Sequence, residues 1–383
     1  MIALPHGFTC HVANIGIKDD TDDFVVVCSD RPTNAAAVFT RSSFAGPSVI
    51  VSRKHAADGV ARAVVVVSKN ANVATGVRGL ANATEIATSV ADRLGVAAGD
   101  VLIASTGVIG RQYPMERVRA GIAAMPGKPT GRDAGDVARG IMTTDTVMKT
   151  ASERVGPATV VGVAKGVGMI EPHMATLITL MFTDAQVAGT DLDQIFRRVI
   201  DRTFNCVSID TDTSTSDTAI VLANGAAGAV DLAEFEAALH HVALSLTKQV
   251  ARDGEGAQTL VEVQVDGAAD AAQAKQVAKA IVNSPLVKTA VHGADPNWGR
   301  VAMAIGKATS ADEVDQAAVV IRFGTLEVYP ATIDDHALAA LANYMRGDEV
   351  LIHVSLGAGD AACTVWGCDL TDGYVRINAD YTT

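Results

Sequence analysis

Short apolar runs rich in valine, isoleucine and threonine recur along the chain, and they constrain the fold more than any other feature. They are separated in places by stretches in which apolar residues recur every three or four positions, as in 195–200 and 232–250, which indicate amphipathic helices. Strands and helices do not alternate regularly, as they would in a parallel βαβ sheet. The order therefore predicts an α+β fold in which helices pack outside sheets. The predicted strands are 24–28, 36–40, 47–51, 61–68, 101–105, 158–164, 177–183, 217–223, 259–267 and 319–330.

One further helix is predicted to begin near Asn82. Asn82 and Glu85 have the spacing of a capping box, and Ile86, Val90 and Leu94 share one helical face. A chain of 383 residues is too long for a single small core, so two lobes or one large α/β unit are expected. No long linker or low-complexity tract divides it.

Composition narrows the class of protein. Hydrophobic residues make up 49% but aromatic residues only 4%, so the core must be built from alanine, valine, isoleucine and leucine. A formal net charge of -12 argues against a nucleic-acid partner, because binding to phosphates needs lysine and arginine. The first residues lack the pattern of a signal peptide, and no apolar run reaches the roughly 18 residues of a membrane span. We expect a cytoplasmic protein with no membrane partner.

The cysteines suggest neither a disulfide framework nor a zinc site. They are odd in number and contain no CxxC pair, which suits a reducing compartment. We interpret Cys10, Cys28, Cys206, Cys363 and Cys368 as small core residues.

The segment 165–184, KGVGMIEPHMATLITLMFTD, is the most informative. Lys165, Gly166 and Gly168 open it, Pro172 interrupts it, and Thr176 stands at the start of an apolar strand. Spacing alone favours a glycine-rich turn that leads into a buried strand. A Walker phosphate loop is excluded, because there the lysine comes last and a helix follows.

The segment 165–185 resembles the part of the ornithine acetyltransferases that holds a self-cleavage site, where a Met-Ala-Thr triplet is cut before the threonine. The sequence is most similar to that of the family variant associated with clavulanic acid biosynthesis, which shares IGRQYPME and KGVGM. Two positions depart from the commoner pattern: Val167 replaces serine, and His173 stands where asparagine or aspartate is usual. Further matching segments are FAGPSV (44–49), KNANVATG (69–76), ASTGVIGRQYPME (104–116), IMTTDT (141–146), SIDTDTSTSDTA (208–219), DGEGA (253–257), 282–308 and the tail GYVRINADYTT (373–383).

The resemblance implies a layered α/β/β/α sandwich with a smaller C-terminal α/β lobe. It also implies autoproteolysis between Ala175 and Thr176, giving fragments 1–175 and 176–383. The activity implied is acetyl transfer from N-acetylornithine to glutamate through Thr176, with no cofactor and no metal. Cleavage would free an α-amine with an ordinary pKa of about 7.7 to 8.0, which can act as the base for the threonine hydroxyl. Two cleaved pairs, or more, are expected to associate.

The family's site positions map onto residues of the matching segments. Thr106 and Gly107 are implied as oxyanion donors; without the resemblance, a Thr-Gly pair after a strand is simply a turn. We expect Lys165 to bind a carboxylate and Glu255 an amine; in isolation each would be a solvated surface charge. The implied substrate-binding residues are Thr143, Lys165, Thr176, Glu255, Asn378 and Thr383.

Two other patterns are assigned structural roles. Asp210, Asp212 and Asp217 lie in a hydroxyl-rich run, but Thr215 and Val221 stand where a calcium loop needs glycine and glutamate, so turn chemistry is predicted. His292 is likewise expected to be structural. The alternatives for the whole chain are a self-cleaving aminopeptidase or amidohydrolase of the same fold, and a catalytically silent binding protein.

Overall fold

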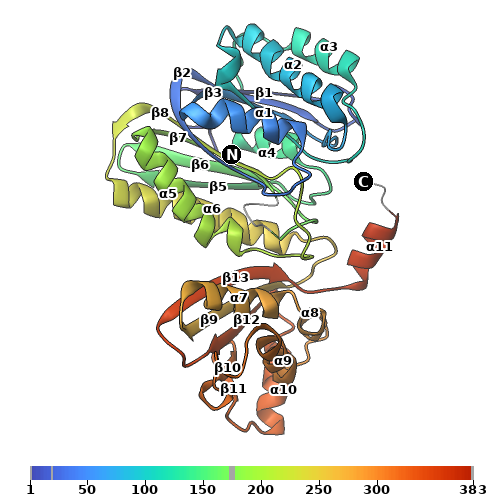
Figure 1. Ribbon diagram of the computed structural model, residues 1–383, viewed down its shortest axis with the longest axis vertical. Helices are drawn as coiled ribbons and strands as arrows, with labels where there is room; N and C mark the ends of the chain where they lie inside the picture. The colour runs from blue at the N-terminus through green and yellow to red at the C-terminus, as the bar shows by residue number, and fades with distance from the viewer. Residues whose placement is uncertain (1, 19, 172–176, 381–383) are drawn as a thin grey trace.

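The valine-rich runs form two stacked layers of strands in the computed structural model, which describes residues 2–18, 20–171 and 177–380 (Figure 1). The first layer contains β1 (Phe8–Ala13), the first half of β2 (Phe24–Phe39), β3 (Val60–Val67) and β4 (Val101–Ser105). The second contains the other half of β2 with β5 (Lys149–Val155), β6 (Ala158–Lys165), β7 (Ile178–Gln186) and β8 (Thr218–Ala229).

The long strand β2 passes from one layer to the other. Its first half pairs with β1 and β3, and residues 34–39 pair antiparallel with β8. The hydrogen-bonded order is β4-β3-β2-β8-β7-β6-β5, with β1 beside β2. Strand β7 lies between β6, to which it is antiparallel, and β8, to which it is parallel. The predicted strands 24–28 and 36–40 are thus parts of one strand.

Alternation along the strands builds three apolar layers. Val64 and Val66 of β3 pack between the strand layers with Leu180 of β7, whereas Ala63 and Val65 of the same strand face outward. Helix α4 (Ala134–Ile141) also contributes to the core between the layers. Outside the first layer lie α1 (Pro47–His55), α2 (Gly76–Leu94) and α3 (Met115–Ala124); outside the second lie α5 (Gly189–Arg202) and α6 (Leu232–Arg252). The predicted α/β/β/α sandwich is confirmed.

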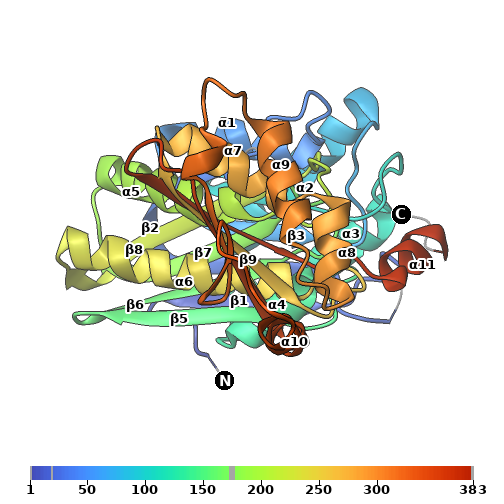
Figure 2. The ribbon, with the colours of Figure 1, turned by 90° about the horizontal axis from the view of Figure 1, so that it is seen from below.

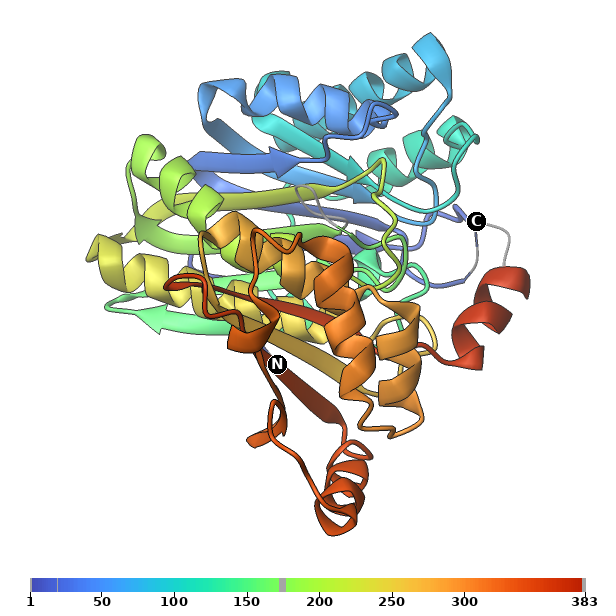
Figure 3. The same ribbon diagram turned by 60° about the horizontal axis from the view of Figure 1, so that its bottom comes forward.

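A second sheet forms the smaller C-terminal lobe, as predicted. Its order is β11-β10-β12-β9-β13, and α7 and α9 lie side by side next to it (Figure 2). Helix α11 (Asp372–Asp380) stands apart from the rest of the lobe (Figure 3). The lobe's strands are β9 (Leu260–Ala268), β10 (Val320–Phe323), β11 (Leu326–Tyr329), β12 (Glu349–Ser355) and β13 (Ala361–Cys368). Its other helices are α7 (Ala271–Val282), α8 (Pro285–His292), α9 (Trp298–Ala308) and α10 (Asp335–Tyr344).

Short 3-10 helices complete the description: η1 (Ala56–Asp58), η2 (Ala98–Asp100), η3 (Phe204–Cys206) and η4 (Gln316–Ala318). None of the helices in the described part of the chain is both long and apolar enough to cross a membrane.

Three local predictions are wrong. The run 319–330 is not one strand but a hairpin of β10 and β11, which pair antiparallel. Residues 47–51 are not a strand but the start of α1, where Pro47 occupies the first turn and Val49 and Val51 are buried. The capping box is also wrong, because α2 already begins at Gly76. Asn82 is therefore inside the helix, and its side chain donates to Gln112 Oε1 at 2.8 Å instead of capping.

Candidate active site

A cavity of about 150 Å³ collects the site residues that the sequence predicts. Six of them line it, although they come from segments far apart in the chain: Thr106, Gly107, Thr143, Lys165, Glu255 and Asn378. Leu177 and Ile178, at the start of β7, line it as well. The predicted residues Ala175, Thr176 and Thr383, and the departure His173, lie outside the described residues.

Ends of strands and helices bring these residues together. Lys165 is the last residue of β6, and Thr106 and Gly107 directly follow β4. Thr143 follows α4, Glu255 follows α6, and Asn378 belongs to α11. Regular elements therefore fix the position of each residue at the cavity wall.

The Thr106–Gly107 turn lies against the segment after β3. The Thr106 N–H donates to the Val67 carbonyl oxygen at 3.4 Å. Gly107 has φ +126°, and an added Cβ would lie 2.2 Å from the Lys69 carbonyl carbon, so only glycine fits here. No described residue accepts a hydrogen bond from the Thr106 hydroxyl or the Gly107 N–H. Both are available as donors to a ligand.

The cavity wall carries a cation and an anion at separate places. Lys165, only 7% exposed, donates from Nζ to Thr143 Oγ1 at 2.7 Å. Burial lowers the pKa of Lys165, and the nearby negative charge of Asp145 opposes that effect. Glu255 accepts hydrogen bonds from Thr144 Oγ1 at 3.2 Å and from Asn378 Nδ2 at 2.9 Å. A zwitterionic ligand would find a partner for each of its charges.

The sequence predicts a turn role for Asp217, but the structure places it in the cavity wall, where it is 1% exposed. Burial raises its pKa well above the ordinary aspartate value, although the N–H of Leu177 and nearby hydroxyls act in the opposite direction. Its Oδ2 and the Ser216 Oγ are buried and have no hydrogen-bond partner among the described residues. A buried acid with a raised pKa is therefore part of this wall, beside the first residues of β7.

Asp210 has the loop-stabilising role that the sequence predicts. Its two carboxylate oxygens accept the N–H groups of Met169, at 2.6 Å, and Ile170, at 2.7 Å. Met169 has φ +56°, so this carboxylate holds an unusual backbone turn just before the segment 172–176. Within the described ranges, no three histidine, cysteine or acidic side chains are grouped to hold a metal ion.

His292 and the cysteines lie away from the cavity lining. The His292 Nδ1 is 3.1 Å from Asp369 Oδ2, a contact within the C-terminal lobe. The five cysteines are free, and the sulfur atoms of Cys206 and Cys363 are 3.9 Å apart.

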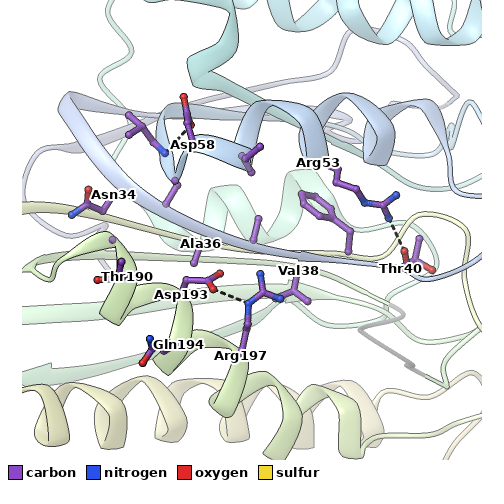
Figure 4. A pocket seen from close by; sticks show the side chains of 18 of the residues that line it. Asn34, Ala36, Val38, Thr40, Arg53, Asp58, Thr190, Asp193, Gln194 and Arg197 are labelled. Atoms are coloured by element: carbon purple, nitrogen blue, oxygen red, sulfur yellow. Dashed lines mark hydrogen bonds and ion pairs between the residues drawn. The ribbon is translucent and has the colours of Figure 1, made fainter.

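A larger cavity of about 1170 Å³ lies between β2, α1 and α5 (Figure 4). None of the predicted site residues that the structure describes lines it. Two of the arginines that line it are already engaged: Arg53 donates to the Thr40 carbonyl oxygen at 2.9 Å, and Arg197 pairs with Asp193 at 2.8 Å. Size alone therefore does not mark the active site, and the smaller cavity has the more suitable chemistry.

Comparison with known proteins identifies the family of the chain. A sequence model of the ArgJ family matches residues 9–383. The chain belongs to the ArgJ family. This confirms the resemblance to the ornithine acetyltransferases that the sequence suggests.

Relatives of this ArgJ-family chain match over nearly their whole length. "Glutamate N-acetyltransferase Oat2" of Streptomyces clavuligerus is 58% identical over 386 residues, covering 99% of this chain and 98% of its own. "Arginine biosynthesis bifunctional protein ArgJ 2" of Nostoc is 57% identical over 381 residues, covering 100% and 98%. The solved structure of the Bacillus halodurans argJ protein is 40% identical, with a TM-score of 0.49, over 52% of this chain and 96% of that one.

Proposed function

We propose that this ArgJ-family enzyme transfers the acetyl group of N-acetylornithine to glutamate, giving ornithine and N-acetylglutamate, through an acetyl ester on Thr176. The observation that carries the proposal is the convergence of Thr106, Gly107, Thr143, Lys165, Glu255 and Asn378 on one cavity. Family membership supports acetyl transfer as the reaction, and we place the protein in arginine or related specialised metabolism.

The first half-reaction follows from the groups on the cavity wall. The Thr176 hydroxyl attacks the acetyl carbon, and its proton passes to the α-amine that cleavage frees. The carbonyl oxygen becomes negatively charged, and the Thr106 hydroxyl and Gly107 N–H donate hydrogen bonds to it. The proton then passes to the nitrogen of ornithine as the carbon–nitrogen bond breaks.

The second half-reaction reverses these steps with glutamate. Both amino acids have an α-carboxylate, which Lys165 is suited to hold, and ornithine has an additional amine suited to Glu255. One site can then serve donor and acceptor in turn, because ornithine leaves before glutamate binds.

The proposed cleavage would leave two fragments that share one sheet. Fragment 1–175 would contribute β6, and fragment 176–383 would contribute β7 and β8; β7 pairs with β6 along residues 178–183. The β2–β8 pairing crosses the same boundary. These ladders support fragments that stay associated, and Lys165 and Glu255 would then come from different fragments of one site. We further propose a cytoplasmic enzyme in which two such pairs, or more, associate.

Acetyl transfer and hydrolysis are separated by one assay. With N-acetylornithine and glutamate supplied together, N-acetylglutamate should form in step with ornithine, and free acetate should remain a minor product. Mass spectrometry of the products measures this partition. Acetate as the main product in the presence of glutamate would favour the self-cleaving amidohydrolase alternative, and no turnover at all would favour a binding protein.

A further inference from the structure

A buried charge network lies behind the cavity wall. Lys149 Nζ donates to Asp145 Oδ1 at 2.8 Å and to Asp253 Oδ2 at 2.5 Å. The side chains of Lys149 and Asp145 are fully buried, and that of Asp253 is 5% exposed. None of the three lines the cavity, so the network does not bind a ligand there directly.

Asp145 connects this network to the wall. Its Oδ1 accepts the Gly166 N–H at 2.7 Å, and its Oδ2 accepts the Thr143 N–H at 3.0 Å. The same Oδ2 lies 3.7 Å from Lys165 Nζ. Asp145 therefore contacts both backbone segments that present Lys165 and Thr143, and it is the carboxylate paired with the Lys165 ammonium.

Asp253 connects the network to the segment that carries Glu255. It accepts hydrogen bonds from the N–H of Thr146, at 3.1 Å, and from the Thr146 hydroxyl. It lies two residues before Glu255 in the chain. Lys149 thus bridges two carboxylates, of which one touches Lys165 and the other does not.

Four charges in this region balance. Lys149 and Lys165 offset Asp145 and Asp253, which matters because a buried charge without a partner is costly. An ammonium has three donors, and Lys165 directs one to Thr143 and lies within ion-pair distance of Asp145. Among residues 2–18, 20–171 and 177–380 the third donor has no further partner, and it can serve a ligand in the cavity that Lys165 lines.

We propose that Asp145, anchored by Lys149, is the positioning residue that keeps Lys165 charged and directed toward a substrate carboxylate. This inference rests on the proposed function, in which Lys165 binds that carboxylate. Burial disfavours the charged form of both groups, but Lys165 and Lys149 outweigh it for Asp145 and hold its pKa at about 2. For Lys165, burial lowers the pKa, Asp145 opposes this, Lys149 adds to it, and Glu255 opposes it. The positive charge of Lys165 in turn opposes the rise in the pKa of Asp217.

Two substitutions should move the ionisation of Lys165 in opposite directions. Asp145→Asn removes the negative charge that favours the ammonium, so the alkaline limb of kcat/KM for N-acetylornithine should shift to lower pH by about one unit or more. Lys149→Met removes a neighbouring positive charge, so the limb should shift to higher pH. General loosening of the site would not produce opposite shifts.

Asp253→Asn is the matched control. It removes the same charge and the same kind of contact to Lys149, but it leaves the Asp145–Lys165 contact in place. The alkaline limb should therefore stay close to its position in the unaltered protein, even if the melting temperature falls as it does in Asp145→Asn.

A second measurement follows the ionisation of Lys165 without any enzymatic turnover. Trace acetylation with acetic anhydride over a pH series, followed by mass spectrometry of the peptide that contains Lys165, reports how the ammonium titrates in each variant. The same order of shifts is expected.

If the protein transfers no acetyl group but the labelling shifts appear, the proposed function fails while the Asp145–Lys165 coupling stands. Unchanged labelling in Asp145→Asn, or shifts of one sign in both Asp145→Asn and Lys149→Met, would overturn the inference. If Asp145→Asn does not fold, a downward shift or no shift in Lys149→Met overturns it equally.

Discussion

Replacing Thr176 with alanine is expected to leave the chain uncut and to lower acetyl transfer by a factor of at least about 10,000. The alanine lacks the hydroxyl that must attack twice, first the preceding peptide bond and then the acetyl group. Gel electrophoresis and N-terminal sequencing check the first effect, and product analysis checks the second. The unaltered protein should give fragments 1–175 and 176–383, the latter beginning Thr-Leu-Ile-Thr.

Thr176→Ser is the control for this experiment. Serine keeps the hydroxyl and loses only a methyl group, so part of the cutting and part of the transfer should remain. An uncut chain that still transfers acetyl groups would rule out the N-terminal amine as the base.

Replacing Thr106 with alanine should slow transfer by about 100- to 1,000-fold, the usual loss when one oxyanion donor is removed. The Thr106 N–H bond to Val67 belongs to the backbone and survives the substitution, so the melting temperature should change little. Self-cleavage should slow too, because it also passes through a tetrahedral intermediate with a negatively charged oxygen, to which the same donors would bind. Initial rates and the time course of fragment formation measure both effects.

Thr106→Ser separates the hydroxyl from the shape of the side chain. It should keep most of the transfer rate, because the donor remains. A transfer rate in Thr106→Ala within a factor of two of the unaltered rate would show that the oxyanion donors lie elsewhere.

The strands were predictable because burial on both faces leaves a simple pattern. Val64 and Val66 face the core between the layers while Ala63 and Val65 face the outer helices, so residues 63–67 are all apolar, which is typical of a strand buried on both faces. The same pattern misled at 47–51, where a similar run became the first turns of α1. Local β propensity there yields to packing of Val49 and Val51 against the rest of the fold. The capping pattern at Asn82 misled in a different way. Asn82 lies inside a long helix, and its side chain contacts Gln112 instead of capping a helix end.

The site residues were likewise predictable only in part. Thr106, Lys165 and Glu255 could be located only through the resemblance, because alone each is an ordinary turn residue or surface charge. The sequence places Asp217 in a turn-forming run but does not indicate its burial, because that burial depends on strands that are distant in sequence. The network of Lys149 and Asp253 joins residues 104 positions apart, and no local pattern links them.

The central claim is that the acetyl group rests on Thr176 between donor and acceptor, and intact-mass measurement tests it most directly. Incubation with N-acetylornithine alone should add one acetyl mass to the fragment that begins at Thr176 and leave the other fragment unchanged. Adding glutamate should then remove that mass and release N-acetylglutamate. No added mass on this fragment, together with double-reciprocal plots that intersect instead of running parallel, would contradict a covalent intermediate and require donor and acceptor to bind at the same time.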